Sequence, residues 1–330
     1  MKFSGKRRAI FPAILLSLAV LGLVFSLMGC GTTTSPAPSG QSTTIVQGKT
    51  QTGSATTQTT TPVTAAATTA APAVREVILA TTTSTQDTGL LDVLVPLFEQ
   101  KTGYRVKTIA VGTGAAIAMG QRGEADVLLV HDYTKEIPLV NNGYGINRKL
   151  VMHNDFIIAG PAADPAGIIG SKTAIDAYKK IAAAKALFIS RGDASGTNSA
   201  ELRLWTAAGI SSKGQSWYQE TGQGMGATLA VAAEKNGYVF TDNATYYSTQ
   251  KTTGLKVVFE GDPVLLNVYH VIQVNPGKSN KINGPGGRAF VLFMIDPEIQ
   301  RIIGQFGLGK FGRALFVPDA GKTEAELGVQ

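Results

Sequence analysis

A row of hydroxyl side chains stands where one apolar run of the chain ends and another begins. The stretch "ATTTSTQDTGL" at residues 80–90 follows "VREVILA" and contains Thr82, Thr83 and Ser84. Hydroxyl groups at the start of a helix add hydrogen-bond donors to the unpaired backbone N–H groups found there. Because an ordinary helix N-cap needs only one such hydroxyl, the surplus indicates a binding site for a ligand rich in acceptor atoms.

An arginine occupies the same kind of position later in the chain. In "FISRGDASGTNSAELRLW" an apolar run leads into Arg191, and Ser195, Gly196 and Thr197 open an amphipathic helix. A guanidinium group donates in a fork that fits an oxyanion, and the hydroxyl and amide groups would converge beside it. The alternative is a surface arginine paired with a nearby acid such as Asp193, with the hydroxyls only capping the helix.

Two glycine-rich loops supply further candidates. "VGTGAAI" places Thr113 and Gly114 after an apolar run, where glycine lets backbone amides approach a ligand, although a plain turn has the same pattern. "GQGMGAT" places Gly224, Met225 and Gly226 ahead of another helix, and we treat these three as weaker ligand-binding candidates.

The loops connect alternating strands and helices. "EVILA", "YRVKTIAVG" and "DVLLVHD" are typical of buried strands, and "TGLLDVLVPLFEQKTG" and "GAAIAMGQRGEA" between them have helical spacing. This alternation predicts an α/β fold with parallel strands and right-handed crossovers. Ligands of such sheets bind beyond the carboxyl ends of the strands, and the hydroxyl stretch lies at one of these ends.

Signatures of catalysis are missing from the sequence. There is no G-x-x-x-x-G-K-[ST], G-x-S-x-G or H-E-x-x-H motif, and the three histidines fall in no triad arrangement. The single cysteine excludes disulfides, zinc-thiolate sites and cysteine catalysis from the folded part. We therefore expect no catalytic residues, no metal and no cofactor, and the chain is not predicted to be an enzyme.

The net charge of +7 does not indicate a partner that is a polyanion. Residues 1–74 contain five basic residues and no acid, so 25 basic residues remain against 23 acids in the part that is expected to fold. A nearly balanced domain gives no reason to expect nucleic acid as a partner.

The N-terminal region has the pattern of an exported, anchored protein. A basic segment and the apolar run "AIFPAILLSLAVLGLVFSLMG" end in "LMGC", which resembles a bacterial lipobox, so residues 1–29 are expected to be a signal peptide and Cys30 to be lipidated. An uncleaved membrane span is the alternative. Of residues 31–74, 15 are threonine and none is aromatic, which predicts a disordered tether over 30–74.

Several long motifs together resemble one known family. They are "ATTTSTQDTGLLDVLVPLFEQKTGYRVKTIAVGTG", "GEADVLLVHD", "VMHNDFIIAGP", "SRGDASGTNSAELRLW" and "GYVFTDNATYY", and they resemble the tungstate-binding TupA family of ABC-importer solute-binding proteins over about residues 76–320. The resemblance implies a two-lobed periplasmic-binding-protein fold that closes on a tetrahedral oxyanion. Each lobe would be a mostly parallel sheet flanked by helices, and Thr82 with its neighbours, Arg191 and Thr197 would contact the ligand.

The resemblance leaves a choice of ligand. Tungstate and molybdate are unprotonated dianions near neutral pH, so neutral donors and one guanidinium would satisfy them. Phosphate is the competitor, since related phosphate-binding proteins carry an Arg-x-Asp-x-Ser-Gly-Thr motif that residues 191–197 match. A carboxylate such as Asp132 would then accept the proton of hydrogen phosphate, but we expect Asp132 to be a helix N-cap and His131 to be a packed or surface residue.

The expected architecture has two crossings between lobes. "VMHNDFIIAGP" and "VLLNVYHVIQVNP" are assigned to the outward and return crossings. Lobe 1 would comprise residues 75–155 and 268–330, and lobe 2 residues 156–267. The expected partners are the oxyanion, a permease and, through the lipid anchor, the outer face of the cytoplasmic membrane, with the protein itself a monomer.

Overall fold

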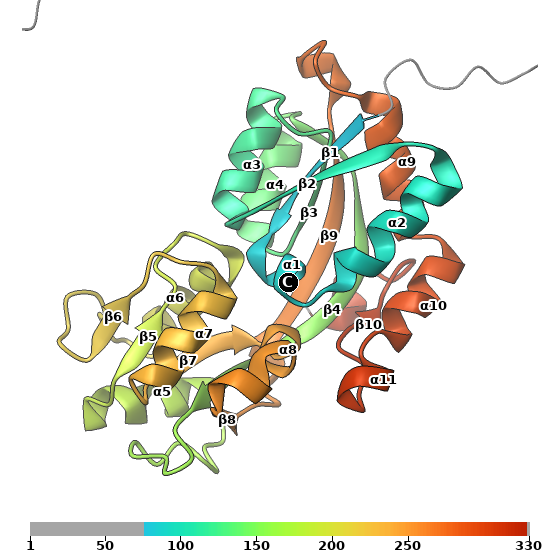
Figure 1. Ribbon diagram of the computed structural model, residues 1–330. Coiled ribbons are helices and arrows are strands. Elements are labelled where there is room, and N and C mark those ends of the chain that lie inside the picture. The colour runs from blue at the N-terminus through green and yellow to red at the C-terminus, as the bar shows by residue number, and fades with distance from the viewer. Residues whose placement is uncertain (1–75, 329–330) are drawn as a thin grey trace, which may run out of the picture. The chain divides into compact units, whose positions relative to one another are not determined.

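The computed structural model describes residues 76–328, all within a compact unit of residues 67–330 (Figure 1). The strands are β1 (Glu76–Thr82), β2 (Arg105–Val111), β3 (Val127–Val130), β4 (Gly145–Gly160), β5 (Phe188–Ser190), β6 (Tyr218–Glu220), β7 (Tyr238–Asp242), β8 (Lys256–Phe259), β9 (Leu266–Val274) and β10 (Val317–Pro318). The α-helices are α1 (Thr83–Asp87), α2 (Leu90–Thr102), α3 (Thr113–Arg122), α4 (Tyr133–Asn141), α5 (Ala174–Ala184), α6 (Gly196–Ala207), α7 (Met225–Glu234), α8 (Asn243–Thr253), α9 (Gly284–Met294), α10 (Pro297–Gln305) and α11 (Leu308–Phe311). Short 3-10 turns are η1 (Pro263–Leu265), η2 (Pro276–Lys278) and η3 (Ala325–Leu327).

Lobe 1 is built on the strand order β2-β1-β3-β9-β4. β1 pairs in parallel with β2 and β3, as the alternation of strands and helices predicted. Apolar residues of α2, α9 and α10 form the core on one face of this sheet, and those of α3 and α4 form it on the other (Figure 1). Because both faces are covered, β3 is buried along its whole length.

Lobe 2 continues the sheet with β7, β5 and β6, and β8 pairs with the end of β4. β5 lies parallel to both β6 and β7. An aromatic core around Trp205 fills one face under α5 and α6. Met225 and Leu229 of α7 pack on the other face with Tyr246 of α8.

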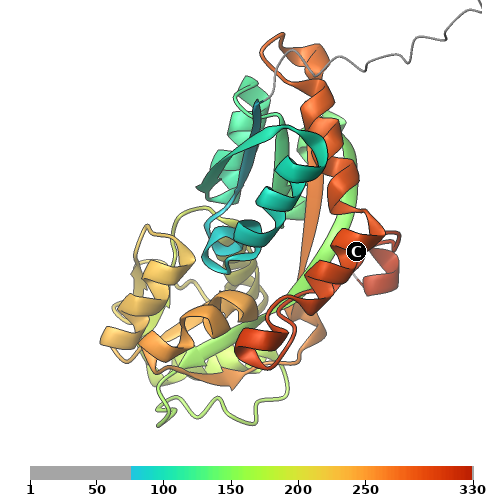
Figure 2. The same ribbon diagram turned by 45° about the vertical axis from the view of Figure 1, so that its right-hand side comes forward.

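Two long antiparallel strands connect the lobes (Figure 2). β4 pairs with β9 through Asp155 and with β7 from Phe156 onward, so the crossing point is defined by its change of partner. The expected two-lobed α/β fold with two crossing strands is confirmed. The pairing is more mixed than the expected mostly parallel sheets, because β4 and β9 run antiparallel to their neighbours. We keep the division at residues 155/156 and 267/268 as a proposal, which the partner change of β4 supports.

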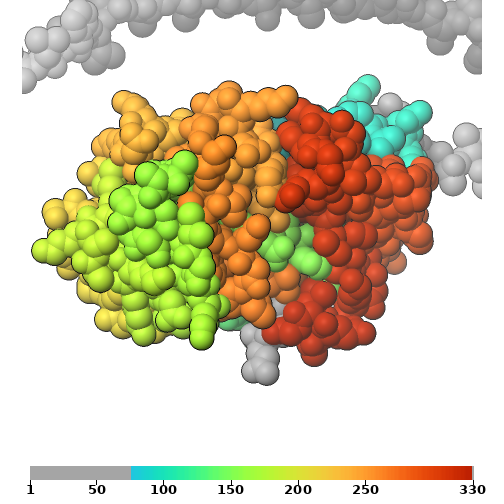
Figure 3. Space-filling view, turned by 90° about the horizontal axis from the view of Figure 1, so that it is seen from below, coloured from blue at the N-terminus to red at the C-terminus, as the bar shows by residue number. Residues whose placement is uncertain are grey.

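The C-terminal segment returns to the crossing strands. β10 pairs with β4 at Met152 and His153, and Arg313 donates to the hydroxyl of Tyr247 on α8 at 2.5 Å. Figure 3 shows this red segment beside the orange surface of lobe 2. Within residues 76–328 no helix has the length and apolar character needed to cross a membrane. The predicted signal peptide, the lipidated Cys30 and the tether lie outside the described residues.

Candidate functional site

The helices that follow the candidate loops begin close to one another, between the lobes. Three hydrogen bonds show this: Gly196 N donates to Thr113 Oγ1 at 3.0 Å, Arg191 Nη2 donates to Thr83 Oγ1 at 3.0 Å, and Gly226 N donates to a carboxylate oxygen of Asp87 at 3.1 Å. Each joins a residue of lobe 1 to one of lobe 2. The N-termini of α3, α6 and α7 therefore face a common region, and the partial positive charge of helix N-termini favours an anion there.

Arg191 supplies a guanidinium group to this region and is only 1% exposed. Its Nη2 donates to Thr83 and, at 2.5 Å, to Asp193 Oδ2. Its Nε and Nη1 have no hydrogen-bond partner among the described residues, and neither has the buried hydroxyl of Thr197. Buried donors are almost always paired in native proteins, so these groups indicate a bound acceptor. The pairing with Asp193 that the alternative interpretation predicted does occur, but it uses one nitrogen of Arg191 and lies in the interior rather than on a solvated surface.

The loop that carries Arg191 is shaped by a buried carboxylate. Glu201 of α6 accepts hydrogen bonds from Ser190 Oγ at 2.7 Å, Tyr218 Oη at 2.7 Å and Trp205 Nε1 at 3.1 Å. Ser190 Oγ in turn accepts from Gly192 N at 3.2 Å. Burial raises the pKa of Glu201 to about 7, despite the lowering effect of these three donors.

The start of α6 combines capping with binding capacity. Ser195 is the N-cap residue, and its Oγ accepts from Asn198 N at 3.2 Å, as the capping alternative predicted. Gly196 must be small, because a Cβ there would lie 3.0 Å from both the Nδ1 and the carbonyl oxygen of His131. Thr197 is buried at 1% with its hydroxyl unpaired, so it is the better donor candidate of the three.

The hydroxyl loop divides into inward and outward members. Thr82 caps α1, with its Oγ1 accepting from Thr85 N at 3.3 Å, and it also contacts the Thr85 hydroxyl at 2.7 Å. Ser84 Oγ lies 3.1 Å from Thr82 Oγ1, so both hydroxyls are engaged inside lobe 1. Thr83 faces lobe 2 and contacts Arg191. The structure thus brings Thr83 to the arginine, while Thr82 and Ser84 form a layer behind it.

The two glycine-rich loops also reach the region between the lobes. Thr113 accepts from Gly196 N and keeps its own hydroxyl proton for another acceptor. Gly114 lies against the Ala194 carbonyl, where an added Cβ would be 3.4 Å from the oxygen. A Cβ on Gly224 would lie 3.2 Å from the side chain of Thr83. Met225 packs its side chain in the core of lobe 2, so it can offer only its backbone.

His131 packs against this site, and its contacts with the hydroxyl loop were not predicted from the sequence. It was expected to be a packed or surface residue; it is packed at 6% exposure, and its Nε2 lies 3.2 Å from Thr82 Oγ1 and 3.3 Å from Ser84 Oγ. Burial and then the charge of Arg191 lower its pKa to about 4, so it is neutral. The available signal was its position at the end of β3, on the same sheet edge as the hydroxyl loop.

Asp132 is committed to partners inside the protein. It occupies the N-cap position of α4, as expected, but its side chain caps no backbone N–H group. Instead it accepts from Lys135 Nζ and from Thr134 Oγ1, each at 2.6 Å. Burial acts to raise the pKa of Asp132, but the hydrogen bonds from Lys135 and Thr134 outweigh it and the pKa is lowered. An ionised, paired carboxylate is a poor acceptor for a ligand proton.

Comparisons with known proteins agree with this geometry. A family model described as the PBP superfamily domain matches residues 50–298. The "Tungstate-binding protein TupA" of Peptoclostridium acidaminophilum is 47% identical over 248 residues, which cover 74% of this chain and 86% of that protein. A "Putative ABC transporter anion-binding protein" of Haloferax volcanii is 42% identical over 318 residues, which cover 95% of this chain and 87% of that protein.

A solved structure leads to the same family. The tungstate-binding protein TupA from Desulfovibrio alaskensis G20 matches with a TM-score of 0.64 and 46% identity, over 75% of this chain and 100% of that one. These relatives are named as binding proteins, which confirms the expectation that the chain is not an enzyme. The chain belongs to the TupA family of solute-binding proteins within the PBP superfamily.

Proposed function

We propose that this protein is the extracytoplasmic solute-binding component of an ABC importer and that it captures tungstate between its lobes. The observation that carries the proposal is the buried guanidinium of Arg191, whose Nε and Nη1 lack partners beside the unpaired hydroxyl of Thr197. A dianion placed there would receive donors from both lobes, among them the two guanidinium nitrogens of Arg191 that Asp193 leaves unpaired. The names of the relatives support tungstate as that dianion.

The donors and acceptors of the site favour an anion without a proton. Thr83, Thr113 and Thr197 carry hydroxyls that can donate, and the partial positive charge of the helix N-termini adds to the attraction for an anion. Asp193 accepts from Arg191 and from Ser195 N, and Asp132 from Lys135, so both carboxylates already have donors. Hydrogen phosphate would need a free acceptor for its proton, and molybdate would not. We therefore propose tungstate or molybdate as the ligand, with phosphate as the second candidate.

Delivery to a permease and anchoring through Cys30 complete the proposal. A ligand held by donors from both lobes stabilises their closed arrangement, and a permease can distinguish that arrangement from an open one. The "LMGC" sequence supports lipidation at Cys30, which would hold the protein on the outer face of the cytoplasmic membrane.

Calorimetric titration with tungstate, molybdate, sulfate and phosphate tests the ligand. We expect one tungstate or molybdate per chain, and much weaker binding of sulfate and phosphate. Phosphate binding that is tight and that collapses in Asp132→Asn, with negligible tungstate binding, would replace tungstate by the second candidate. Binding of none of the four anions would overturn the proposal.

A further inference from the structure

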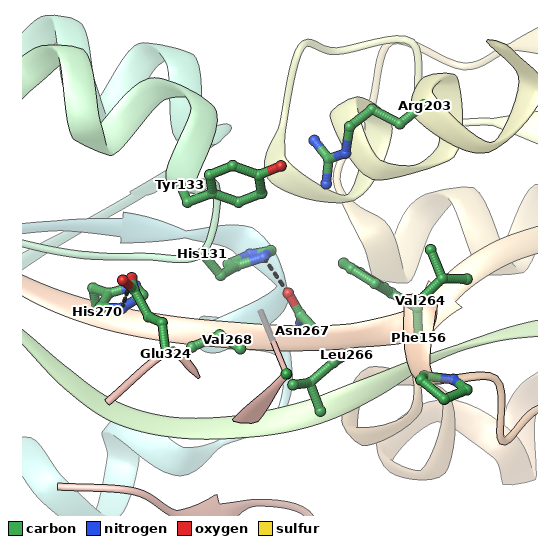
Figure 4. A pocket seen from close by; sticks show the side chains of 12 residues that line it. His131, Tyr133, Phe156, Arg203, Val264, Leu266, Asn267, Val268, His270 and Glu324 are labelled. Carbon is green, nitrogen blue, oxygen red and sulfur yellow. Dashed lines mark hydrogen bonds and ion pairs between the residues drawn. The ribbon is translucent and has the colours of Figure 1, made fainter. Parts of the chain in front are cut away.

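A line of buried polar side chains runs through the crossing strands from lobe 2 to the hydroxyl loop. Asn154 Nδ2 donates to Asp242 Oδ1 at 3.2 Å, and Asn267 Nδ2 donates to Asn154 Oδ1 at 2.7 Å. His131 Nδ1 lies 2.8 Å from Asn267 Oδ1 (Figure 4). All four residues are at most 6% exposed. Asn154 and Asn267 are directly opposite each other in the β4–β9 ladder, next to the point where β4 changes partner.

The direction of these hydrogen bonds is set at the end in lobe 2. Asp242 caps α8, and its Oδ1 accepts from Thr245 N at 2.8 Å, a backbone donor whose direction cannot be reversed. Asn154 must therefore present its NH₂ group to that oxygen and its carbonyl to Asn267. Asn267 must in turn donate to Asn154, which leaves its own carbonyl facing His131.

The same logic assigns the proton of the imidazole. Since Asn267 Oδ1 is an acceptor, His131 Nδ1 must carry the hydrogen. In a neutral ring the other nitrogen, Nε2, is then an acceptor. The atoms within reach of Nε2 are the hydroxyl oxygens of Thr82 at 3.2 Å and Ser84 at 3.3 Å. One of these hydroxyls donates to the ring and cannot donate to a ligand.

We propose that Asp242, Asn154 and Asn267 hold His131 in the tautomer protonated on Nδ1, and that its Nε2 accepts a hydrogen bond from one hydroxyl of the Thr82–Ser84 layer. His131 is then a positioning residue: it orders the layer behind Thr83 and leaves the outward hydroxyls of Thr83, Thr113 and Thr197 to face an oxyanion. The low pKa of His131, caused first by its burial, agrees with a neutral ring. The role in ligand binding rests on the proposed function, whereas the assignment of the tautomer does not.

Nitrogen-15 NMR of the histidine rings tests the tautomer without any ligand. The chain has three histidines, so the signals of His131 are identified as those lost in His131→Gln. At neutral pH we expect a protonated Nδ1 and an unprotonated Nε2. A ring protonated on Nε2, or on both nitrogens, would overturn the proposal.

A pair of matched variants tests the coupling to binding. Asn267→Leu removes the acceptor for Nδ1, and we expect it to change the tautomer and to weaken tungstate binding about tenfold, as for the loss of one buried hydrogen bond. Gln273→Leu removes another buried amide of β9 that bonds Asn147 and Gly284, and we expect it to leave both readouts unchanged.

The outcomes separate the two proposals. An unchanged tautomer in a folded Asn267→Leu protein, or equal losses of affinity in the two variants, would contradict the positioning role. If the wild type shows the Nδ1 tautomer but binds no tungstate, the proposed function fails and the tautomer assignment stands.

Discussion

Arg191 places a guanidinium group in the buried part of the candidate site. Its guanidinium meets one carboxylate, that of Asp193, and leaves two nitrogens without partners among the described residues. An arginine in this state is costly unless an anion completes its hydrogen bonds. The unpaired nitrogens of Arg191 therefore favour a bound anion at this site.

Removing the side chain of Arg191 should greatly weaken tungstate binding. Loss of one partner of a buried charge pair costs about 2 to 5 kcal/mol, so Arg191→Ala should weaken tungstate binding by roughly thirty-fold to several thousand-fold. Arg191→Lys keeps the charge but loses the planar guanidinium fork, so its tungstate affinity should lie between those of the wild type and Arg191→Ala. Calorimetry measures the affinities, with circular dichroism to confirm folding. An Arg191→Ala affinity within threefold of the wild type would contradict this role.

Two neighbouring threonines should respond differently to the same truncation. Thr82→Ala removes the N-cap of α1 and should lower the free energy of unfolding by about 1 kcal/mol. Thr83→Ala removes the hydroxyl that meets Arg191 and should act mainly on tungstate affinity, by about 1 to 3 kcal/mol. Urea unfolding and calorimetry on both variants separate the effects. The reverse pattern would show that Thr82 is the ligand contact.

The sequence was enough to identify these residues as candidates, but not to show which of their hydroxyls face a ligand. The hydroxyl stretch, Arg191 and Thr197 stand out because donors of one kind follow strand ends. Which hydroxyl faces a ligand depends on His131, 47 positions from Ser84, and on a lobe that approaches from elsewhere in the chain. Those contacts arise from tertiary packing, so no local pattern encodes them.

At the scale of elements, α6 links the aromatic core of lobe 2 to the arginine loop. Its inward face carries Glu201 and Trp205, and its first turn carries Thr197. Gly192 in the preceding loop has a φ of +59°, and a Cβ there would lie 2.6 Å from that of Glu220. The loop conformation therefore depends on glycine at this position.

The buried carboxylate of α6 should give a defined dependence of stability on pH. The folded-state pKa of Glu201 is about 7 against an ordinary 4.5, so the folded state retains this proton longer than the unfolded state. The contribution of Glu201 to the free energy of unfolding is fully present below pH 4.5 and is lost as the pH rises through about 7. The total change can reach about 3 kcal/mol.

Unfolding by urea between pH 4.5 and 8 compares the wild type with Glu201→Gln. The wild type should lose stability relative to the variant as the pH rises. His131, with its lowered pKa, acts in the opposite direction in both proteins, because its contribution is lost as the pH falls toward 4. A difference between the two proteins that does not vary with pH would contradict the buried, titrating carboxylate.

The elements themselves were largely predictable. The first three strands and the helices between them follow from apolar spacing and glycine stops, and their parallel pairing is confirmed. The antiparallel pairing of β3 with β9 was not predicted, because β9 lies about 140 positions later in the chain and its apolar run suits either direction. Strand direction was fixed by the connections, which local patterns do not contain.

At the scale of the whole molecule, contacts outside the arginine site hold the lobes together. Lys135 of α4 donates to Ala194 O at 3.1 Å and to Ser199 Oγ at 2.5 Å, both in lobe 2. Asp87 accepts from Gly226 N at the start of α7. These contacts join the lobes directly, without an intervening ligand, so they should stabilise the closed arrangement and slow release.

Lys135→Met should therefore act on the rate of release. Loss of its two contacts across the lobes should speed tungstate dissociation about tenfold and leave association nearly unchanged. Lys179→Met, which removes an exposed lysine of α5, is the matched control. Stopped-flow measurement of the association and dissociation rate constants of tungstate tests this prediction. A variant that slows association while dissociation stays constant would show that Lys135 attracts the anion rather than holding the lobes.

The path of the chain through the lobes also bears on how the protein is made. Lobe 1 begins with β1 but cannot pair the open edge of β3 until β9 is available, and lobe 2 lies between them. A chain emerging from the ribosome would thus complete the strands of lobe 2 while lobe 1 still exposes an apolar edge. Nascent chains that stop before Leu266 should be targets for chaperones and proteases, whereas chains that extend past α9 should resist them.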